Sequence, residues 1–159
     1  MLRPTVARLI SLFVIACIAV FSWFMPTSIE VSQCDCLIVK FLNVGQGDAI
    51  HIVTPDGYEM LIDGGRDSQV IRELAKGRSF FDKQIDVIVA THPDGDHIGG
   101  LIDVLHRYEV DTILTTTNQN DTPDATAFFD AVIAEKAAVI YVESGQRFTL
   151  GASTTISIF

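Results

Sequence analysis

Short apolar runs separated by turn signals predict the secondary structure of most of this chain. Six runs are rich in β-branched residues or alternate in polarity, which is typical of strands: residues 36–43, 49–54, 58–62, 85–90, 112–115 and 138–142. Helical periodicity and end signals predict three helices: 69–76 capped by Ser68, 98–107 and 122–136. Residues 147–150 and 154–159 predict a final hairpin. Strands first, then alternating strands and helices, indicate an α/β sandwich.

The N-terminal segment follows a different pattern. Residues 9–25 contain no charged residue, and a helix of this length spans ~26 Å, near the lower limit for crossing a bilayer. Arg3 and Arg8 precede the run, Trp23 lies near its far end and Pro26 ends it. These features predict one transmembrane helix with a cytoplasmic N-terminus. A signal peptide that is removed by cleavage is the alternative.

The chain therefore divides into a membrane anchor or signal segment (residues 1–26), a linker (27–35) and one domain (36–159). The expected location is the cytoplasmic membrane, with a single span and an extracytoplasmic body. Secretion after signal cleavage is the alternative. Cys34 and Cys36 are interpreted as small residues at a strand start, with a redox pair or a metal site as alternatives.

Composition and charge exclude several classes. The apolar fraction of 48% excludes a disordered chain. The chain has 11 Lys and Arg against 20 Asp and Glu, and removing residues 1–25, which hold two of the bases and no acid, leaves −11. The acidic charge of the residues after 25 argues against a protein that binds nucleic acid through a basic surface. Lys76, Arg78 and Lys83 form a small basic cluster, interpreted as a solvated face or a phosphate-contacting rim.

The densest chemistry follows the predicted strand 85–90 directly. Residues 92–97 read His-Pro-Asp-Gly-Asp-His, so four potential metal ligands stand within six positions: His92, Asp94, Asp96 and His97. A strand end fixes the backbone, and the loop after it can turn several side chains toward one point. Imidazole favours zinc and related metals, and carboxylates also accept harder ions. The sequence favours two neighbouring metals; a solvated loop with an Asp that caps the next helix is the alternative.

Three segments in this order resemble the metallo-β-lactamase superfamily. Residues 91–100 (THPDGDHIGG) resemble its HxHxDH signature followed by Gly, and residues 41–52 and 58–65 are similar to its two N-terminal segments. The resemblance covers about residues 36–159 and implies an αββα sandwich. It is most similar to the extracellular hydrolase domain of ComEC-like proteins of competence and DNA uptake. That similarity implies a membrane hydrolase that cleaves phosphodiester bonds through a metal-activated water, with a membrane channel as a partner.

The resemblance also implies roles for individual residues. His92 and Asp94 would belong to a first metal site, and Asp96 and His97 to a second. Asp96 would lie close to the metal-bound water and act as the catalytic residue. Asp63 would brace the ligand loop by hydrogen bonding. The implied cleft-lining residues are Asn43, Gln46 and Asp48.

Two departures from the family pattern change these expectations. Asp94 stands where most of the superfamily has His, so Mn²⁺ becomes an alternative to Zn²⁺ for the two divalent ions. The further family ligands have no candidate before Phe159, because His51 lies in a predicted strand and His106 in a predicted helix. The sequence therefore predicts an N-terminal fragment that is inactive alone. Two other functions stay open: a hydrolase of another ester, a thioester or a lactone, and a non-catalytic membrane-anchored module without a full metal set. The sequence predicts no oligomeric state.

Overall fold

The structure is a computed structural model that describes residues 13–17, 35–118 and 120–159. Residues Cys34–Phe159 form one compact unit, separate from Met1–Gln33. Residues 13–17 are helical, and the rest of the predicted span 9–25 lies outside the described residues. Within the described ranges, no helix is both long enough and apolar enough to cross a membrane.

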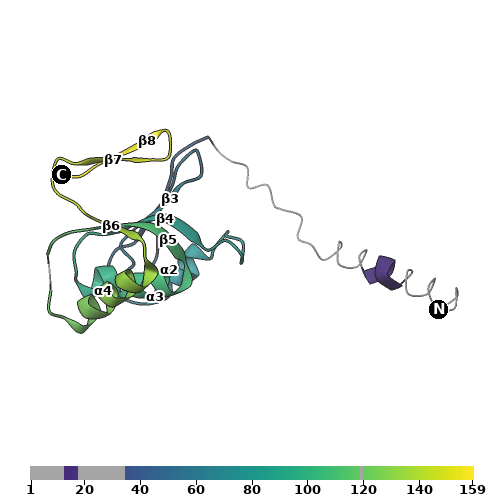
Figure 1. Cartoon of the computed structure of the whole chain (residues 1–159), viewed down its shortest axis with the longest axis horizontal. Helices are drawn as coiled ribbons and strands as arrows, with labels where there is room; N and C mark the ends of the chain where they lie inside the picture. The colour runs from purple at the N-terminus through teal and green to yellow at the C-terminus, as the bar shows by residue number, and fades with distance from the viewer. Residues whose placement is uncertain (1–12, 18–34, 119) are drawn as a thin grey trace. The chain divides into compact units, whose positions relative to one another are not determined.

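A six-stranded mixed sheet organises the compact unit (Figure 1), with its strands in chain order. The first three strands pair antiparallel, and the third to the sixth pair parallel. The strands are β1 (Ile38–Phe41), β2 (Ile50–Val53), β3 (Glu59–Ile62), β4 (Gln84–Ala90), β5 (Glu109–Thr115) and β6 (Ala138–Tyr141). All six strands predicted from the sequence are confirmed, most of them shorter at one or both ends. Since β1, β3 and β4 run in one direction, their carboxyl ends share one edge of the sheet.

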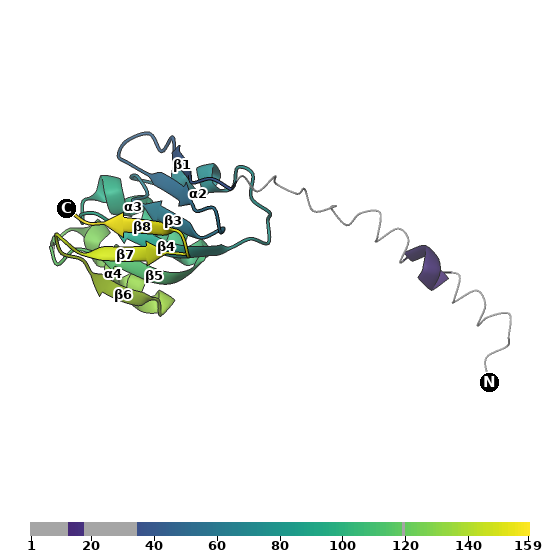
Figure 2. The same cartoon turned by 90° about the horizontal axis from the view of Figure 1, so that it is seen from above.

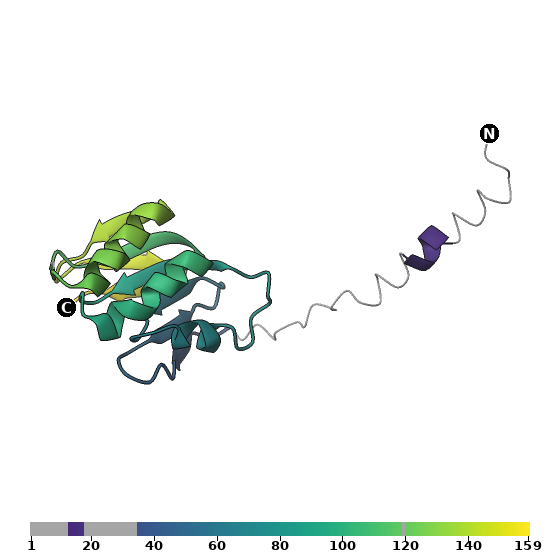
Figure 3. The ribbon, with the colours of Figure 1, turned by 90° about the horizontal axis from the view of Figure 1, so that it is seen from below.

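Three helices cover one face of this sheet, as Figure 3 shows from below. They are α2 (Gln69–Leu74), α3 (Gly95–Arg107) and α4 (Pro123–Glu135). Helix α3 buries Ile98, Leu101 and Val104 completely, at the spacing that gives a helix one apolar stripe. These side chains pack with fully buried strand residues such as Ile88 into one core.

One predicted cap and one predicted helix start differ from the structure, whereas α2 begins at Gln69 as predicted. Ser68 occupies the N-cap of α2 without a side-chain capping bond, and the backbone N–H of Gln69 donates to Asp67 Oδ1 at 2.8 Å instead. Helix α3 starts at Gly95, three residues before the predicted start at Ile98. By contrast, Thr122 caps α4 as its position predicts, since its side chain accepts from the backbone N–H of Ala125.

The final hairpin, β7 (Arg147–Leu150) and β8 (Thr154–Ser157), lies on the face of the sheet opposite the helices (Figures 1 and 2). Asp56, in the turn between β2 and β3, accepts hydrogen bonds from Thr54 Oγ1 at 2.6 Å and from the backbone N–H of Ala152 at 2.5 Å. These bonds lower the pKa of Asp56 below its ordinary value. The described residues thus form three layers of the expected αββα sandwich: helices, sheet and hairpin.

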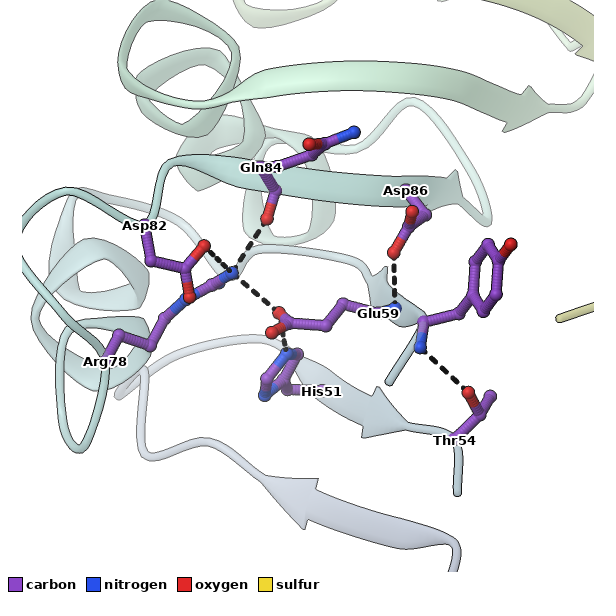
Figure 4. A network of polar contacts seen from close by, with 8 residues as sticks. His51, Thr54, Glu59, Arg78, Asp82, Gln84 and Asp86 are labelled. Carbon is purple, nitrogen blue, oxygen red and sulfur yellow. Dashed lines mark hydrogen bonds and ion pairs between the residues drawn. The ribbon is translucent and has the colours of Figure 1, made fainter. Parts of the chain in front are cut away.

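A buried polar network closes the end of the sheet where β3 and β4 begin (Figure 4). Glu59 Oε2 lies 2.9 Å from His51 Nε2 and 2.8 Å from Arg78 Nη2. The same guanidinium donates to the backbone oxygen of Gln84 at 2.7 Å and pairs with Asp82 at 3.3 Å. His51 is therefore a buried structural residue, as its strand position predicts, and the network holds the segment that leads into β4 against the sheet.

Candidate metal centre

The motif at residues 92–97 lies at the edge of the sheet where β3 and β4 end. These strands pair in parallel, with Ile62 opposite Val89. Asp63 follows β3, and its backbone N–H donates to Val89 O at 2.9 Å. Thr91 comes directly after Ala90, the last residue of β4. Because parallel strands bring their carboxyl ends together, Asp63 and the motif meet although 28 residues separate Asp63 from Thr91.

Asp63 is the buried centre of this edge. Asp63 is only 3% exposed. Its backbone φ of 56° lies in the left-handed region, which Asp tolerates better than most residues. Oδ1 accepts the backbone N–H of Thr91 at 2.9 Å, and Oδ2 accepts the Thr91 hydroxyl at 2.6 Å. His97 Nδ1 also lies 2.8 Å from Oδ2. The carboxylate thus bridges the first residue after β4 and a histidine of α3.

This hydrogen-bond chain sets the tautomers of both histidines. A carboxylate only accepts, so His97 Nδ1 must carry the proton that it shares with Asp63. The single hydroxyl proton of Thr91 goes to Asp63, so Thr91 Oγ1 is the acceptor in its 3.0 Å contact with His92 Nδ1. Each neutral ring therefore keeps its lone pair on Nε2, the arrangement that carboxylate-supported histidine ligands use in metal sites.

The two imidazole rings lie against each other. The ring centroids of His92 and His97 are 3.7 Å apart, with an angle of 48° between the planes. Asp94 stands beside them, with its Oδ2 3.6 Å from His92 Nε2. Its other oxygen accepts a hydrogen bond from Asn120 Nδ2 at 2.9 Å. Asp94 occupies the N-cap of α3 but makes no side-chain capping bond, which removes the capping alternative for this residue.

Asp96 and His97 belong to the first turn of α3, not to the preceding loop as predicted. This position places a carboxylate at the positive end of the helix dipole. Asp96 is half-buried, and its side chain makes no hydrogen bond or ion pair within the part of the chain that the structure describes. The carboxylate is therefore available to a ligand.

The loop between β1 and β2 covers the start of α3 through glycine contacts. A Cβ on Gly47 would overlap the backbone oxygen of Asp96, and the φ of Gly47 is +93°. The backbone oxygen of Asp48 accepts from Gly65 N at 2.9 Å, which ties the same loop to the end of β3. The three predicted cleft residues on this loop have exposed side chains: Asn43, Gln46 and Asp48.

The donor atoms are of the types that bind metals, although their side chains do not all converge on one point. Among residues 13–17, 35–118 and 120–159, no three His, Cys, Asp or Glu side chains converge closely enough to hold an ion. Two imidazoles with Nε2 lone pairs lie in contact, and Asp94 stands within 3.6 Å of one of them. Nitrogen and carboxylate donors of this kind suit zinc and manganese. His92, His97, Asp94 and Asp96 could therefore hold such an ion.

Two residues of this centre were not predicted from the sequence. Thr91 joins Asp63 to His92, and Asn120 fixes Asp94. The signal for Asn120 is the polar loop that follows β5, because β5 runs parallel to β4 and ends at the same edge. No local pattern marks Thr91, whose role depends on the approach of Asp63.

Comparisons with known proteins agree with this architecture. A family model described as "Metallo-beta-lactamase superfamily" matches residues 42–141. The fold is similar to MEM-A1, a subclass B3 metallo-β-lactamase from a soil metagenome library, with 20% identity and a TM-score of 0.51 over 71% of this chain and 46% of that one. A mutant metallo-β-lactamase of Cronobacter sakazakii gives 18% identity and a TM-score of 0.51 over the same shares. The chain thus spans about half the length of these structures. No curated protein matches the sequence.

Proposed function

The chain belongs to the metallo-β-lactamase superfamily, and from this premise we propose that it functions as a membrane-anchored, ComEC-like, metal-dependent hydrolase of phosphodiester bonds. The superfamily consists generally of hydrolytic metalloenzymes that typically bind two divalent ions, usually zinc. Since the chain spans about half of the structures that it matches, the activity is proposed for the whole protein.

One observation carries the proposal: the hydrogen bonds of Asp63 and Thr91 occupy Nδ1 of both histidines and leave Nε2 of each ring as the nitrogen that can face a metal. A polar loop without chemistry would not need a carboxylate that is 3% exposed to orient two rings. Burial of a charged group is costly unless its hydrogen bonds are satisfied, and here all the partners belong to the candidate centre. This arrangement favours metal binding over a solvated loop.

The residues of the centre have separate chemical tasks in this proposal. His92, His97, Asp94 and Asp96 would hold divalent ions, Zn²⁺ first and Mn²⁺ as the alternative. Bound ions supply Lewis acidity, which polarises the scissile group and lowers the pKa of water. Asp96, half-buried at the start of α3, orients the attacking water and accepts its proton. Asp63 acts through His97 and Thr91 as a positioning residue.

The proposed location and substrate rest on separate observations. The uncharged run 9–25 and the two arginines before it support anchorage with an extracytoplasmic body. Cys36 is disulfide-bonded, and not a plain small residue as predicted; disulfides persist in oxidising compartments. Phosphodiesters, including those of nucleic acid, are the proposed substrates because of the similarity to ComEC-like hydrolases, with a membrane channel as a proposed partner.

A second candidate substrate class is an uncharged ester, thioester or lactone. The observation that favours it is the density of acidic residues at this edge, where Asp94, Asp96 and Asp124 stand near the start of α3. Without bound cations this charge repels a phosphodiester. Metal content and substrate preference therefore have to be measured together.

The test uses the whole protein, purified in detergent and loaded with Zn²⁺ or Mn²⁺. Metal analysis should give about two divalent ions per chain, the number that two-metal hydrolysis requires. Turnover of bis-p-nitrophenyl phosphate should exceed turnover of a thioester and a lactone of similar size. Asp96→Asn should abolish turnover, whereas Asp103→Asn, on the same helix but outside the centre, should not. Absence of bound metal, or full turnover by Asp96→Asn, would refute the proposal.

A further inference from the structure

Two phenylalanines project into solvent from the segment between α2 and β4. Phe80 is 77% exposed and Phe81 is 85% exposed, and their rings contact each other edge to face with centroids 5.6 Å apart. We propose that this pair, with the lysines beside it, is a membrane-docking tip that holds the domain against the bilayer surface. The inference goes beyond the hydrolase activity and rests on the membrane anchorage proposed above.

The aromatic pair stands on a fixed segment. Two residues before it, Arg78 is held by Glu59 at 2.8 Å and by the backbone oxygen of Gln84 at 2.7 Å. The side chain of Arg78 is only 8% exposed, and its guanidinium carbon lies 5.3 Å from the centroid of the Tyr108 ring. A buried charge with these contacts cannot shift without losing them. The exposure of the two rings is therefore built into the fold.

Exposed bases stand near the pair. Residues 72–83 contain four bases and two acids; the side chain of Arg78 is buried and pairs with Glu59 and Asp82, which leaves Arg72, Lys76 and Lys83 exposed. Lys83 is exposed beside the pair, and Lys76 is 69% exposed while it contacts Glu73 at 2.7 Å. Exposed aromatic rings next to lysines suit the interface of a bilayer with anionic lipids, where the rings enter the headgroup boundary and the lysines meet the phosphates.

The tip lies at the end of the sheet where β1, the first strand of the domain, begins. Strands β1, β3 and β4 run in one direction, so the start of β1 and the segment before β4 share one end of the sheet. Figure 2 shows the segment that leads into β4 projecting at this end. The tip and the start of β1 therefore lie at one end of the sheet, and the candidate metal centre lies at the other end.

The test compares two tryptophan reporters in the full chain after Trp23, the single tryptophan, is replaced by Phe. Phe81→Trp reports on the tip. Phe41→Trp is the matched control, since Phe41 is 80% exposed and is the last residue of β1, at the opposite end of the sheet. Both chains are reconstituted in vesicles of phosphatidylcholine and phosphatidylglycerol at about 3:1, because anionic lipid attracts lysines. The measurements are flotation, emission wavelength, and quenching by brominated acyl chains and by iodide.

The expected result is a blue-shifted emission for Phe81→Trp, with strong quenching by brominated lipid and weak quenching by iodide, and the reverse for Phe41→Trp. Lys76→Gln with Lys83→Gln, or vesicles of phosphatidylcholine alone, should weaken the protection of the tip. If both chains float but Phe81→Trp stays as accessible to iodide as Phe41→Trp, the docking proposal is overturned while anchorage stands. If neither chain floats, both proposals fall. Protection that disappears in nanodiscs holding one chain each would assign the tip to contact between copies, and would also overturn the proposal.

Discussion

Asn in place of Asp63 isolates the role of the carboxylate that orients both histidines. Asn has nearly the same size as Asp and also tolerates positive φ, so the backbone at φ 56° can stay unchanged. The substitution replaces one acceptor oxygen by an NH₂ donor. The Asn oxygen should face the backbone N–H of Thr91, because that group cannot rotate away. The NH₂ group then faces the Thr91 hydroxyl and His97 Nδ1, which are both donors in the native protein.

The magnitude follows from these contacts. His97 can remove the clash only if its proton moves to Nε2, which leaves Nδ1 as an acceptor and takes the metal-facing lone pair away. Loss of such a support for a ligand weakens metal affinity by about 10–100-fold. Folding should also lose about 1.5–3 kcal/mol, the usual contribution of a hydrogen bond to a charged group.

The assays separate the effect on the metal from the effect on folding. Chelator competition gives the Zn²⁺ affinity, histidine ¹⁵N chemical shifts give the tautomer, and urea unfolding gives the stability. Asp86→Asn is the control, because Asp86 accepts a single bond, from the backbone N–H of Glu59 at 2.6 Å, which an Asn oxygen can keep. Unchanged Zn²⁺ affinity together with an unchanged His97 tautomer in Asp63→Asn would refute the orienting role.

Three further predictions concern the contacts that build the domain. Gly57→Ala should cost about 1–2 kcal/mol, since open space surrounds Gly57 and only its positive φ is strained. Gly47→Ala should cost clearly more in urea unfolding because its Cβ would overlap the start of α3, and equal losses would contradict that close packing. Arg78→Met should destabilise the domain by about 3–5 kcal/mol, because it removes the guanidinium that pairs with the partly buried Glu59 and leaves Glu59 only its contact with His51. Lys76→Met, which breaks an exposed pair, should cost less than about 1 kcal/mol, and similar unfolding midpoints would count against the buried network. The pKa of Asp56 is lowered by its hydrogen bonds, so its contribution to stability is complete above the ordinary value of 3.8 and is lost as the pH falls through the lower folded value. Amide exchange in the final hairpin should therefore accelerate below that range in the native chain, and an identical pH profile for Asp56→Asn would show that the carboxylate has no such role.

The strands, most of the helices and the chemical motif could be predicted from the sequence because their signals are local. Apolar alternation and turn residues mark the strands, and Thr122 followed by Pro123 marks the start of α4. The motif at residues 92–97 shows its donors in consecutive positions. The start of α3 has no clear local signal, because Asp94 and Gly95 are turn residues by type, and it is shown by the backbone bond from Ile98 N to Asp94 O at 3.0 Å.

Only the tertiary structure decided how the donors are oriented. Asp63 and Thr91 stand 28 residues apart, and Asn120 stands 26 residues from Asp94, so no local pattern joins these pairs. The parallel pairing of β3, β4 and β5 brings their carboxyl ends to one edge and makes both contacts. The sequence by itself determined which residues can bind a metal. The edge of the sheet determined which nitrogen each histidine presents, because a tautomer depends on the partner that takes the other proton.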